Sequence, residues 1–231
     1  KLGTSQEEDV LFYENPEQAR YFHSVNLTED ERYMFLYESG QGAGSTLWIR
    51  DMQDPKGKFE QIGFDMDYYY SPIDVIDGTL YIFTNYKAPK GKICKVDVKN
   101  PQIENWVELI PESENVIAGI NLADGKMIVT YDQDASHHAF VYDMNGKMLH
   151  EIALPTYGSI GISSDYKDSE IFYAFTSFAF PTTIYRYNIN DNTSEVFRAP
   201  AIDFISEDYT TEQVFVTSKD GTKVPMFLTY K

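Results

Sequence analysis

Short runs of apolar residues, separated by polar turns, follow one another along almost the whole chain. One pattern recurs four times: an apolar-rich run ends in Asp or Asn, and an apolar residue comes next. The four runs are Leu47–Met52, Ile93–Val98, Ala139–Met144 and Ile184–Ile189. Their Asp or Asn positions, 51, 97, 143 and 188, lie 46, 46 and 45 residues apart. A near-constant step of this length indicates an internal structural repeat.

Each repeat predicts four short strands. An apolar strand precedes each run, and before that strand stand a shorter strand and a polar turn, such as Asp77-Gly78 or Asp124-Gly125. Asp-Gly between apolar runs is typical of β-hairpins. The expected second strands are residues 33–37, 80–83, 127–131 and 171–175. The expected fourth strands are residues 59–62, 106–109, 148–152 and 195–197.

This period predicts the blades of a β-propeller. Four antiparallel strands in about 45 residues is the size of one blade. Helical repeats of similar period need long amphipathic runs with a 3.6-residue period, and we find none. The strand Ile171–Phe175 has no polar alternate position, as expected for a sheet that is covered on both faces. We therefore expect an all-β fold, a partial β-propeller with about four four-stranded blades.

Both ends of the chain depart from the repeat. Val10–Tyr13 predicts a strand that completes none of the four units, and we interpret it as the last strand of an earlier blade. Val214–Tyr230 predicts a hairpin around Asp220-Gly221, in which Pro225 favours an edge position. These patterns predict a partial propeller over residues 1–205. Residues 206–231 would form a junction and the first hairpin of a second domain.

Composition and charge exclude several classes of partner. The 231 residues carry a formal net charge of −17, which repels phosphate backbones and anionic lipids. We expect neither a nucleic-acid nor a membrane partner, since no run approaches the roughly 20 apolar residues of a spanning helix. The start, Lys1–Ser5, does not resemble a signal peptide. We expect a cytoplasmic protein, with the periplasm as the alternative. The single Cys94 excludes an internal disulfide.

Several motifs have the residue types of a ligand site without the required spacing. Gly40–Thr46 is glycine-rich, but it lacks the lysine and the following helix of a phosphate loop. His137 and His138 are adjacent, and we interpret them as loop residues, since neighbours on a strand point to opposite faces. Asp65–Asp67 and Asp132–Asp134 lack the rest of a calcium loop and predict solvated turns. We therefore predict no metal and no cofactor.

The chain resembles the prolyl oligopeptidase family over essentially its whole length. The segments that carry the resemblance are Asp208–Phe227, Glu170–Phe178 with Pro181 and Ile184-Tyr185, and Glu8–Pro16 with Leu27–Tyr33. Asp208–Phe227 is similar to the junction between propeller and hydrolase domain. Ser218–Pro225 also has a similar version in oligopeptidase B, whereas Phe175–Phe178 favours prolyl oligopeptidase.

The resemblance implies a seven-bladed propeller inserted before an α/β-hydrolase domain, so about four of the seven blades would lie in this chain. It implies cleavage of short peptides after proline by a Ser–Asp–His triad without a cofactor. The propeller would act as a lid that excludes folded proteins. The implied partners are short proline-containing peptides and the hydrolase domain. The resemblance also implies a substrate contact at Phe22, where the family has an apolar Met.

The catalytic triad is not found in this sequence. A hydrolase nucleophile elbow needs Gly-x-Ser-x-Gly, and the closest match, Tyr157–Gly161, has Tyr157 at the first glycine position. We assign no catalytic residue and expect these 231 residues alone to be inactive as a peptidase.

Two other functions are considered: a stand-alone propeller that binds a protein or peptide, and part of an oligopeptidase B-like peptidase. A propeller with only about four of seven blades leaves blade faces uncovered at both ends and strand edges unpaired, which predicts self-association of these 231 residues.

Overall fold

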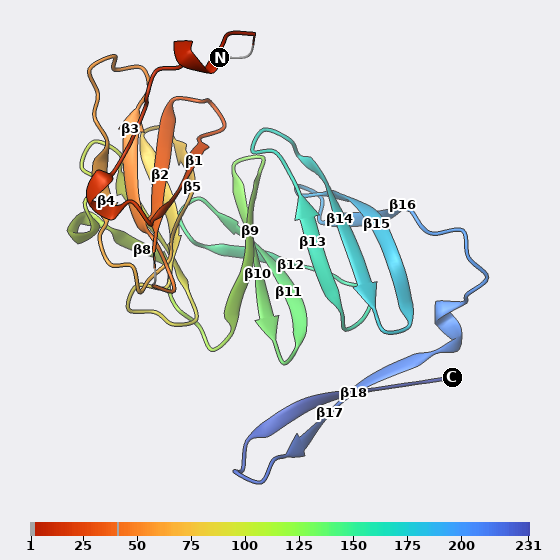
Figure 1. The fold of residues 1–231 in the computed structure, drawn as a ribbon. Coiled ribbons are helices and arrows are strands. Elements are labelled where there is room, and N and C mark those ends of the chain that lie inside the picture. Colours follow the sequence, from red (N-terminus) through yellow and green to blue (C-terminus); the bar gives the residue numbers. More distant parts are fainter. Residues whose placement is uncertain (1–2, 41) are drawn as a thin grey trace.

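Four antiparallel sheets of four strands each follow one another along the chain (Figure 1). The computed structural model describes residues 3–40 and 42–231. Lys1 and Leu2 of the chain start and Gln41 of the Gly40–Thr46 motif lie outside the described residues. In each sheet the strands pair in chain order, so each sheet is a simple meander. The repeat found in the sequence is therefore the structural unit.

The strand bounds agree with the predicted repeat. Sheet 1 contains β1 (Phe22–Leu27), β2 (Tyr33–Ser39), β3 (Thr46–Asp51) and β4 (Glu60–Gly63). Sheet 2 contains β5 (Tyr70–Ile76), β6 (Thr79–Thr84), β7 (Lys92–Asp97) and β8 (Val107–Ile110). Sheet 3 contains β9 (Val116–Ala123), β10 (Lys126–Gln133), β11 (Ser136–Asp143) and β12 (Met148–Ile152). Sheet 4 contains β13 (Ser159–Ser163), β14 (Glu170–Ser177), β15 (Phe180–Asn188) and β16 (Thr193–Arg198).

The helical elements that the structure describes are four single 3₁₀ turns. They are η1 (Gln6–Glu8), η2 (Pro16–Gln18), η3 (Ile103–Asn105) and η4 (Ser206–Asp208). In the described ranges, no helix has the length and apolar character that crossing a lipid bilayer requires.

The predicted Asp-Gly turns close the first hairpins of sheets 2 and 3. Asp77 and Gly78 have φ values of 49° and 78°, and Asp124 and Gly125 have φ values of 44° and 66°. Two consecutive residues with positive φ match the right-handed twist of the flanking strands. Gly and Asp tolerate this backbone conformation better than most residues, which explains why these two residue types stand between the strands.

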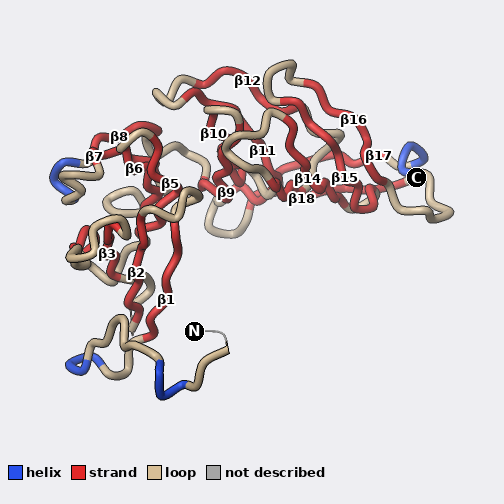
Figure 2. Tube along the Cα trace, turned by 90° about the horizontal axis from the view of Figure 1, so that it is seen from above, coloured by secondary structure: helices blue, strands red, loops and turns tan. Residues whose placement is uncertain are grey.

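The four sheets form an open fan, with a separate hydrophobic core between each pair of neighbours (Figure 2). Strand β6 shows how one strand serves two cores. Its Leu80 and Ile82 pack against sheet 1, whereas Tyr81 between them packs with Met127 and Val129 of sheet 3. Successive side chains of a strand point to opposite faces, so a strand covered on both sides is apolar throughout. This arrangement confirms the partial β-propeller.

The last sheet has one covered and one uncovered face. Ile171, Tyr173 and Phe175 of β14 are buried against sheet 3. The alternating Phe172 points the other way, and its ring lies 4.9 Å from that of Phe197 on β16. Phe197 is 58% exposed. Within the described residues, no further sheet covers this outer face of sheet 4.

The prediction of a strand at Val10–Tyr13 is wrong. Residues 10–13 form no strand. Instead, the rings of Phe12 and Tyr13 lie 5.9 and 5.6 Å from Phe59, and the Arg50 guanidinium lies 4.9 Å from the Phe12 ring. This apolar segment packs through its side chains instead and covers part of the outer face of sheet 1.

The prediction that His137 and His138 lie in a loop is also wrong, because both belong to β11. The reason is the shortness of the turn before that strand. Asp134 and Ala135 both have positive φ values, 50° and 61°, and close the hairpin in two residues, so β11 begins at Ser136.

The C-terminal hairpin is a separate two-stranded sheet. Strand β17 (Thr210–Thr217) pairs with β18 (Lys223–Tyr230), and Pro225 stands opposite Phe215. Both strands of such a sheet are edge strands, as Pro225 predicted. The hairpin lies across one end of the fan (Figure 1). The division into domains at residues 1–205 and 206–231 stays a prediction.

Candidate functional site

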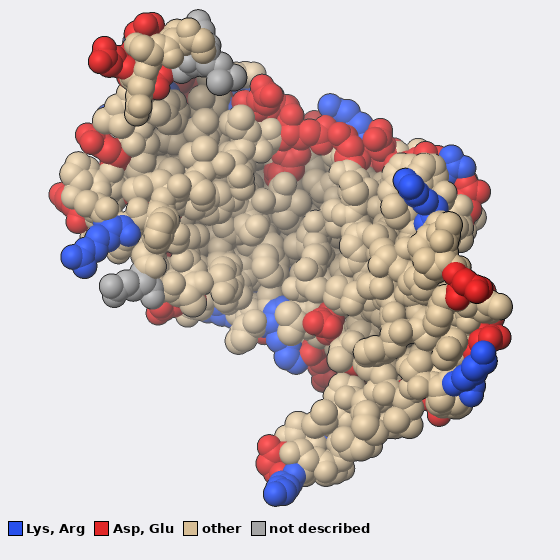
Figure 3. Space-filling view, turned by 45° about the vertical axis from the view of Figure 1, so that its right-hand side comes forward, with Lys and Arg blue, Asp and Glu red and all other residues tan. Residues whose placement is uncertain are grey.

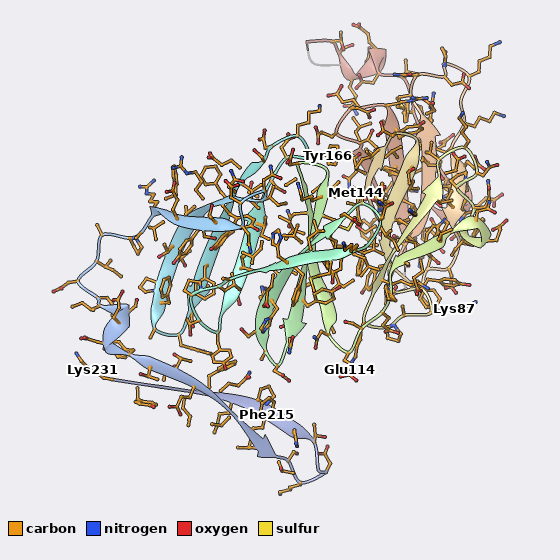
Figure 4. The ribbon with its side chains drawn as sticks, turned by 180° about the vertical axis from the view of Figure 1, so that it is seen from behind. Lys87, Glu114, Met144, Tyr166, Phe215 and Lys231 are labelled. Carbon is orange, nitrogen blue, oxygen red and sulfur yellow. The ribbon has the colours of Figure 1, made fainter. Side chains whose placement is uncertain are left out.

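The two ends of the fan carry different side chains. One end, which we call the hairpin end, holds the β2–β3, β6–β7, β10–β11 and β14–β15 connections, and the β17–β18 hairpin lies against it. Figure 4 shows Lys87 and Glu114 at this end, on the same side as Phe215 and Lys231 of the C-terminal segment. Tyr166 lies at the opposite end.

The hairpin end exposes large apolar side chains from all four sheets or the loops between them. Phe22 is 77% exposed and Phe178 is 72% exposed. The others are Phe64, Tyr69, Val116 and Tyr157. Exposed apolar residues that gather on one surface mark an interaction site. The hairpin end is therefore the candidate functional surface.

The opposite end is acidic. Its turns carry Glu29, Asp30, Glu31, Asp77, Asp124, Asp165 and Asp168. Figure 3 shows carboxylates gathered along the upper edge of the molecule. Burial raises the pKa of Tyr166, and the negative charges of Asp77, Asp74, Asp124 and Glu29 raise it further. Turns from different sheets thus lie around this tyrosine. The acidic end suits contact with water, whereas the apolar side chains of the hairpin end suit contact with another protein surface.

The C-terminal hairpin contacts the loops of sheets 3 and 4. The ring of Phe227 lies 5.6 Å from Tyr157 and 5.4 Å from Phe178. The side chain of Gln213 donates a hydrogen bond of 2.7 Å to the carbonyl oxygen of Asp134. Two of the exposed aromatics of the hairpin end are thereby engaged by the segment that leaves the propeller.

Phe22 lies at the hairpin end, at the first position of β1. Beside it is a depression of about 700 Å³, lined by residues 16–22 and Gly40. A Cβ atom on Gly40 would come within 2.5 Å of the Tyr21 ring, so the close approach of Tyr21 requires glycine there. The role of Phe22 in substrate contact stays a prediction, and its exposure leaves the ring accessible to a ligand.

The other sequence candidates have structural partners. In the Gly40–Thr46 loop, the Gly44 amide donates to the Met66 carbonyl at 2.8 Å, and strand β3 follows where a phosphate loop would have a helix. The Ile160 amide donates to Nδ1 of His137 at 3.1 Å, whereas Nδ1 of His138 lies 2.9 Å from Glu151. Within residues 3–40 and 42–231, no three His, Cys, Asp or Glu side chains gather as metal ligands.

Sequence reasoning missed Glu38, whose side chain is only 4% exposed. Tyr13 and Asn15 donate hydrogen bonds to its Oε1 at 2.7 and 2.8 Å, and Nε2 of His23 lies 3.3 Å away. Burial raises the pKa of Glu38, but the hydrogen bonds from Asn15, Tyr13 and His23 outweigh it and lower the pKa overall. Burial, together with the hydrogen bond to Glu38 and its charge, raises the pKa of Tyr13 to about 12.

Comparison with known proteins identifies the family. Residues 1–200 match the family model described as the N-terminal beta-propeller domain of prolyl oligopeptidase. The chain belongs to this family. It is 35% identical over 232 residues to the prolyl endopeptidase of Elizabethkingia meningoseptica, which aligns with 100% of the chain and 33% of that protein. It is 33% identical over 242 residues to a prolyl oligopeptidase of Omphalotus olearius, with 99% and 32% coverage.

Solved structures of prolyl oligopeptidases have the same fold. One, from a study of two prolyl endopeptidases and their inter-domain dynamics, has a TM-score of 0.88 and 26% identity and covers 100% of this chain and 34% of its own. Prolyl oligopeptidase B from Galerina marginata, bound to a 25mer macrocyclization substrate, has a TM-score of 0.86 and 25% identity, with 99% and 33% coverage. The chain therefore spans about a third of the length of the prolyl oligopeptidases that it matches.

Proposed function

We propose that this chain is the propeller part of a serine peptidase that hydrolyses short peptides after proline. The observation that carries the proposal is the full-length similarity to prolyl endopeptidases, 35% over 232 residues. The Ser–Asp–His triad lies outside these 231 residues and needs no cofactor. The propeller contributes gating and part of the substrate-lining surface.

The asymmetry of the two ends supports this role. An apolar hairpin end, with β17–β18 already docked on it, suits a surface that covers an α/β-hydrolase domain. Phe22 and its depression lie at the same end, where they would face a peptide held between the two domains. The Galerina marginata enzyme is bound to 25mer and 35mer substrates, which supports a peptide as the ligand. We propose the cytoplasm as the compartment, which fractionation of source cells tests against the periplasm.

The test is an assay of the full-length protein on a proline-containing peptide and on a dibasic peptide. We expect cleavage after proline, no cleavage at the dibasic site, and no hydrolysis by the 231-residue chain alone. Cleavage at the dibasic site would instead support an oligopeptidase B-like enzyme. A full-length protein without peptidase activity, but with a stable specific complex, would support a binding module.

The same assay tests Phe22. Replacing Phe22 with Ala removes an apolar contact with the substrate. A loss of about 1.4 kcal/mol of binding free energy weakens the affinity tenfold. We expect KM to rise by roughly this factor with little change in kcat. The control is Met148→Ala, which removes an exposed apolar side chain from the outer strand β12. An unchanged KM in Phe22→Ala would contradict the substrate contact.

A further inference from the structure

The side chain of Glu38 is almost fully buried near the end of β2, and three donors converge on one of its oxygen atoms. Tyr13, Asn15 and His23 reach Oε1 at 2.7, 2.8 and 3.3 Å. The hydroxyl of Thr46 lies 3.5 Å from Oε2. A buried carboxylate is costly unless it is well hydrogen-bonded, so this arrangement of donors is what stabilises Glu38 in its position.

The donors lie on either side of a short loop. Asn15 directly precedes Pro16, and His23 directly follows Phe22 and stands opposite Glu38 in the β1–β2 register. The carboxylate therefore ties together the two ends of residues 16–22. Inside the loop, the Tyr21 amide donates to the Gln18 carbonyl at 2.9 Å. Compact surface loops of this kind have their ends close together and frequently serve function.

A second contact holds the loop at the start of the β2–β3 connection. The Tyr21 ring lies against Gly40, two residues beyond Glu38. Residues 16–22 are thus held by Glu38 at their base and by Gly40 near Phe22, and these same residues line the depression beside Phe22.

We infer that Glu38 is a positioning residue whose carboxylate holds loop 16–22 and thereby sets the shape of the depression at Phe22. Its consequence for peptide binding rests on the proposed function. Without the carboxylate, Tyr13, Asn15 and His23 lose their common acceptor. The loop then keeps its Gly40 contact, its internal hydrogen bonds and the pairing of Phe22 with Ser39 at the start of β1.

Hydrogen–deuterium exchange of the 231-residue chain tests this inference directly. In Glu38→Ala we expect the amides of residues 15–23 to exchange at least tenfold faster, while those of the second strand, residues 33–37, keep their protection. Glu14→Ala is the matched control, because it makes the same change at an exposed carboxylate between Tyr13 and Asn15. Unchanged exchange of residues 15–23 in Glu38→Ala would overturn the inference.

If Glu38→Ala unfolds sheet 1, Tyr13→Phe decides the question, because it removes one donor and keeps the ring. A rise in exchange confined to residues 13–23 supports the inference, and no change at those residues overturns it.

Kinetics of the full-length protein separate this inference from the proposed function. With Glu38→Ala we expect a raised KM and a nearly unchanged kcat, as for Phe22→Ala. If Phe22→Ala leaves KM unchanged, the substrate contact fails while the exchange result stands. If Phe22→Ala raises KM but a Glu38→Ala protein with a mobile loop does not, the positioning role fails.

Discussion

Replacing Phe175 with alanine should lower the free energy of unfolding by about 3–5 kcal/mol, the usual cost of removing a buried phenylalanine ring. Phe175 is fully buried in the core between sheets 3 and 4. Its ring lies 5.3 Å from Phe180 and packs close to Gly158 at the hairpin end. The loss would therefore report the stacking of one blade on the next. Urea titration followed by circular dichroism measures it.

Strand β14 offers its own control for this experiment. Phe172 is three residues earlier and points to the outer face of sheet 4, where Phe197 is its ring partner. Because that face is uncovered, we expect Phe172→Ala to cost about 1 kcal/mol or less. Equal losses for the two variants would contradict the stacking of sheet 4 on sheet 3.

The 231-residue chain should self-associate as its concentration rises, because nothing in the described part of the chain covers the outer face of sheet 4 or the exposed edge strand β16. Phe197→Glu places a charge on this apolar face and should shift the population to monomer. Sedimentation velocity over a wide concentration range measures the effect. The net charge of −17 opposes association without removing the apolar surface.

Met148→Glu provides the control for self-association. Met148 is 51% exposed on the outer strand β12, so this variant adds the same charge away from the outer face of sheet 4. We expect it to associate like the unmodified chain. A wild-type chain that stays monomeric at high concentration would contradict the prediction.

The strands and the core could be predicted from one rule: a strand that is covered on both faces is apolar at every position. A run such as Leu80-Tyr81-Ile82 is apolar throughout, since alternate side chains enter two different cores. Asp-Gly at 77–78 and 124–125 fixed the position of two hairpins through the backbone conformation that these residues favour. Such signals are local, so a single sequence contains them.

The parts that were missed depend on contacts that are distant in the sequence. Val10–Tyr13 has the composition of a strand, but whether it pairs depends on a free strand edge elsewhere. Glu38 ends an apolar strand, and its donors at Tyr13 and Asn15 lie 25 and 23 residues away. No local pattern shows this convergence.

The apolar hairpin end could have been found. In a meander, alternate connections share one end, so sorting the loops of the four repeats by end would have grouped Phe64, Tyr157 and Phe178.

The reading frame that follows the codon of Lys231 tests the central claim most directly. We predict that it continues into an α/β-hydrolase domain with a Gly-x-Ser-x-Gly elbow, followed in chain order by an Asp and a His. These residues would hydrolyse the peptide, and the present chain would be the propeller that covers their active site. A stop codon shortly after Lys231, with no hydrolase domain in the gene, would contradict the proposed function.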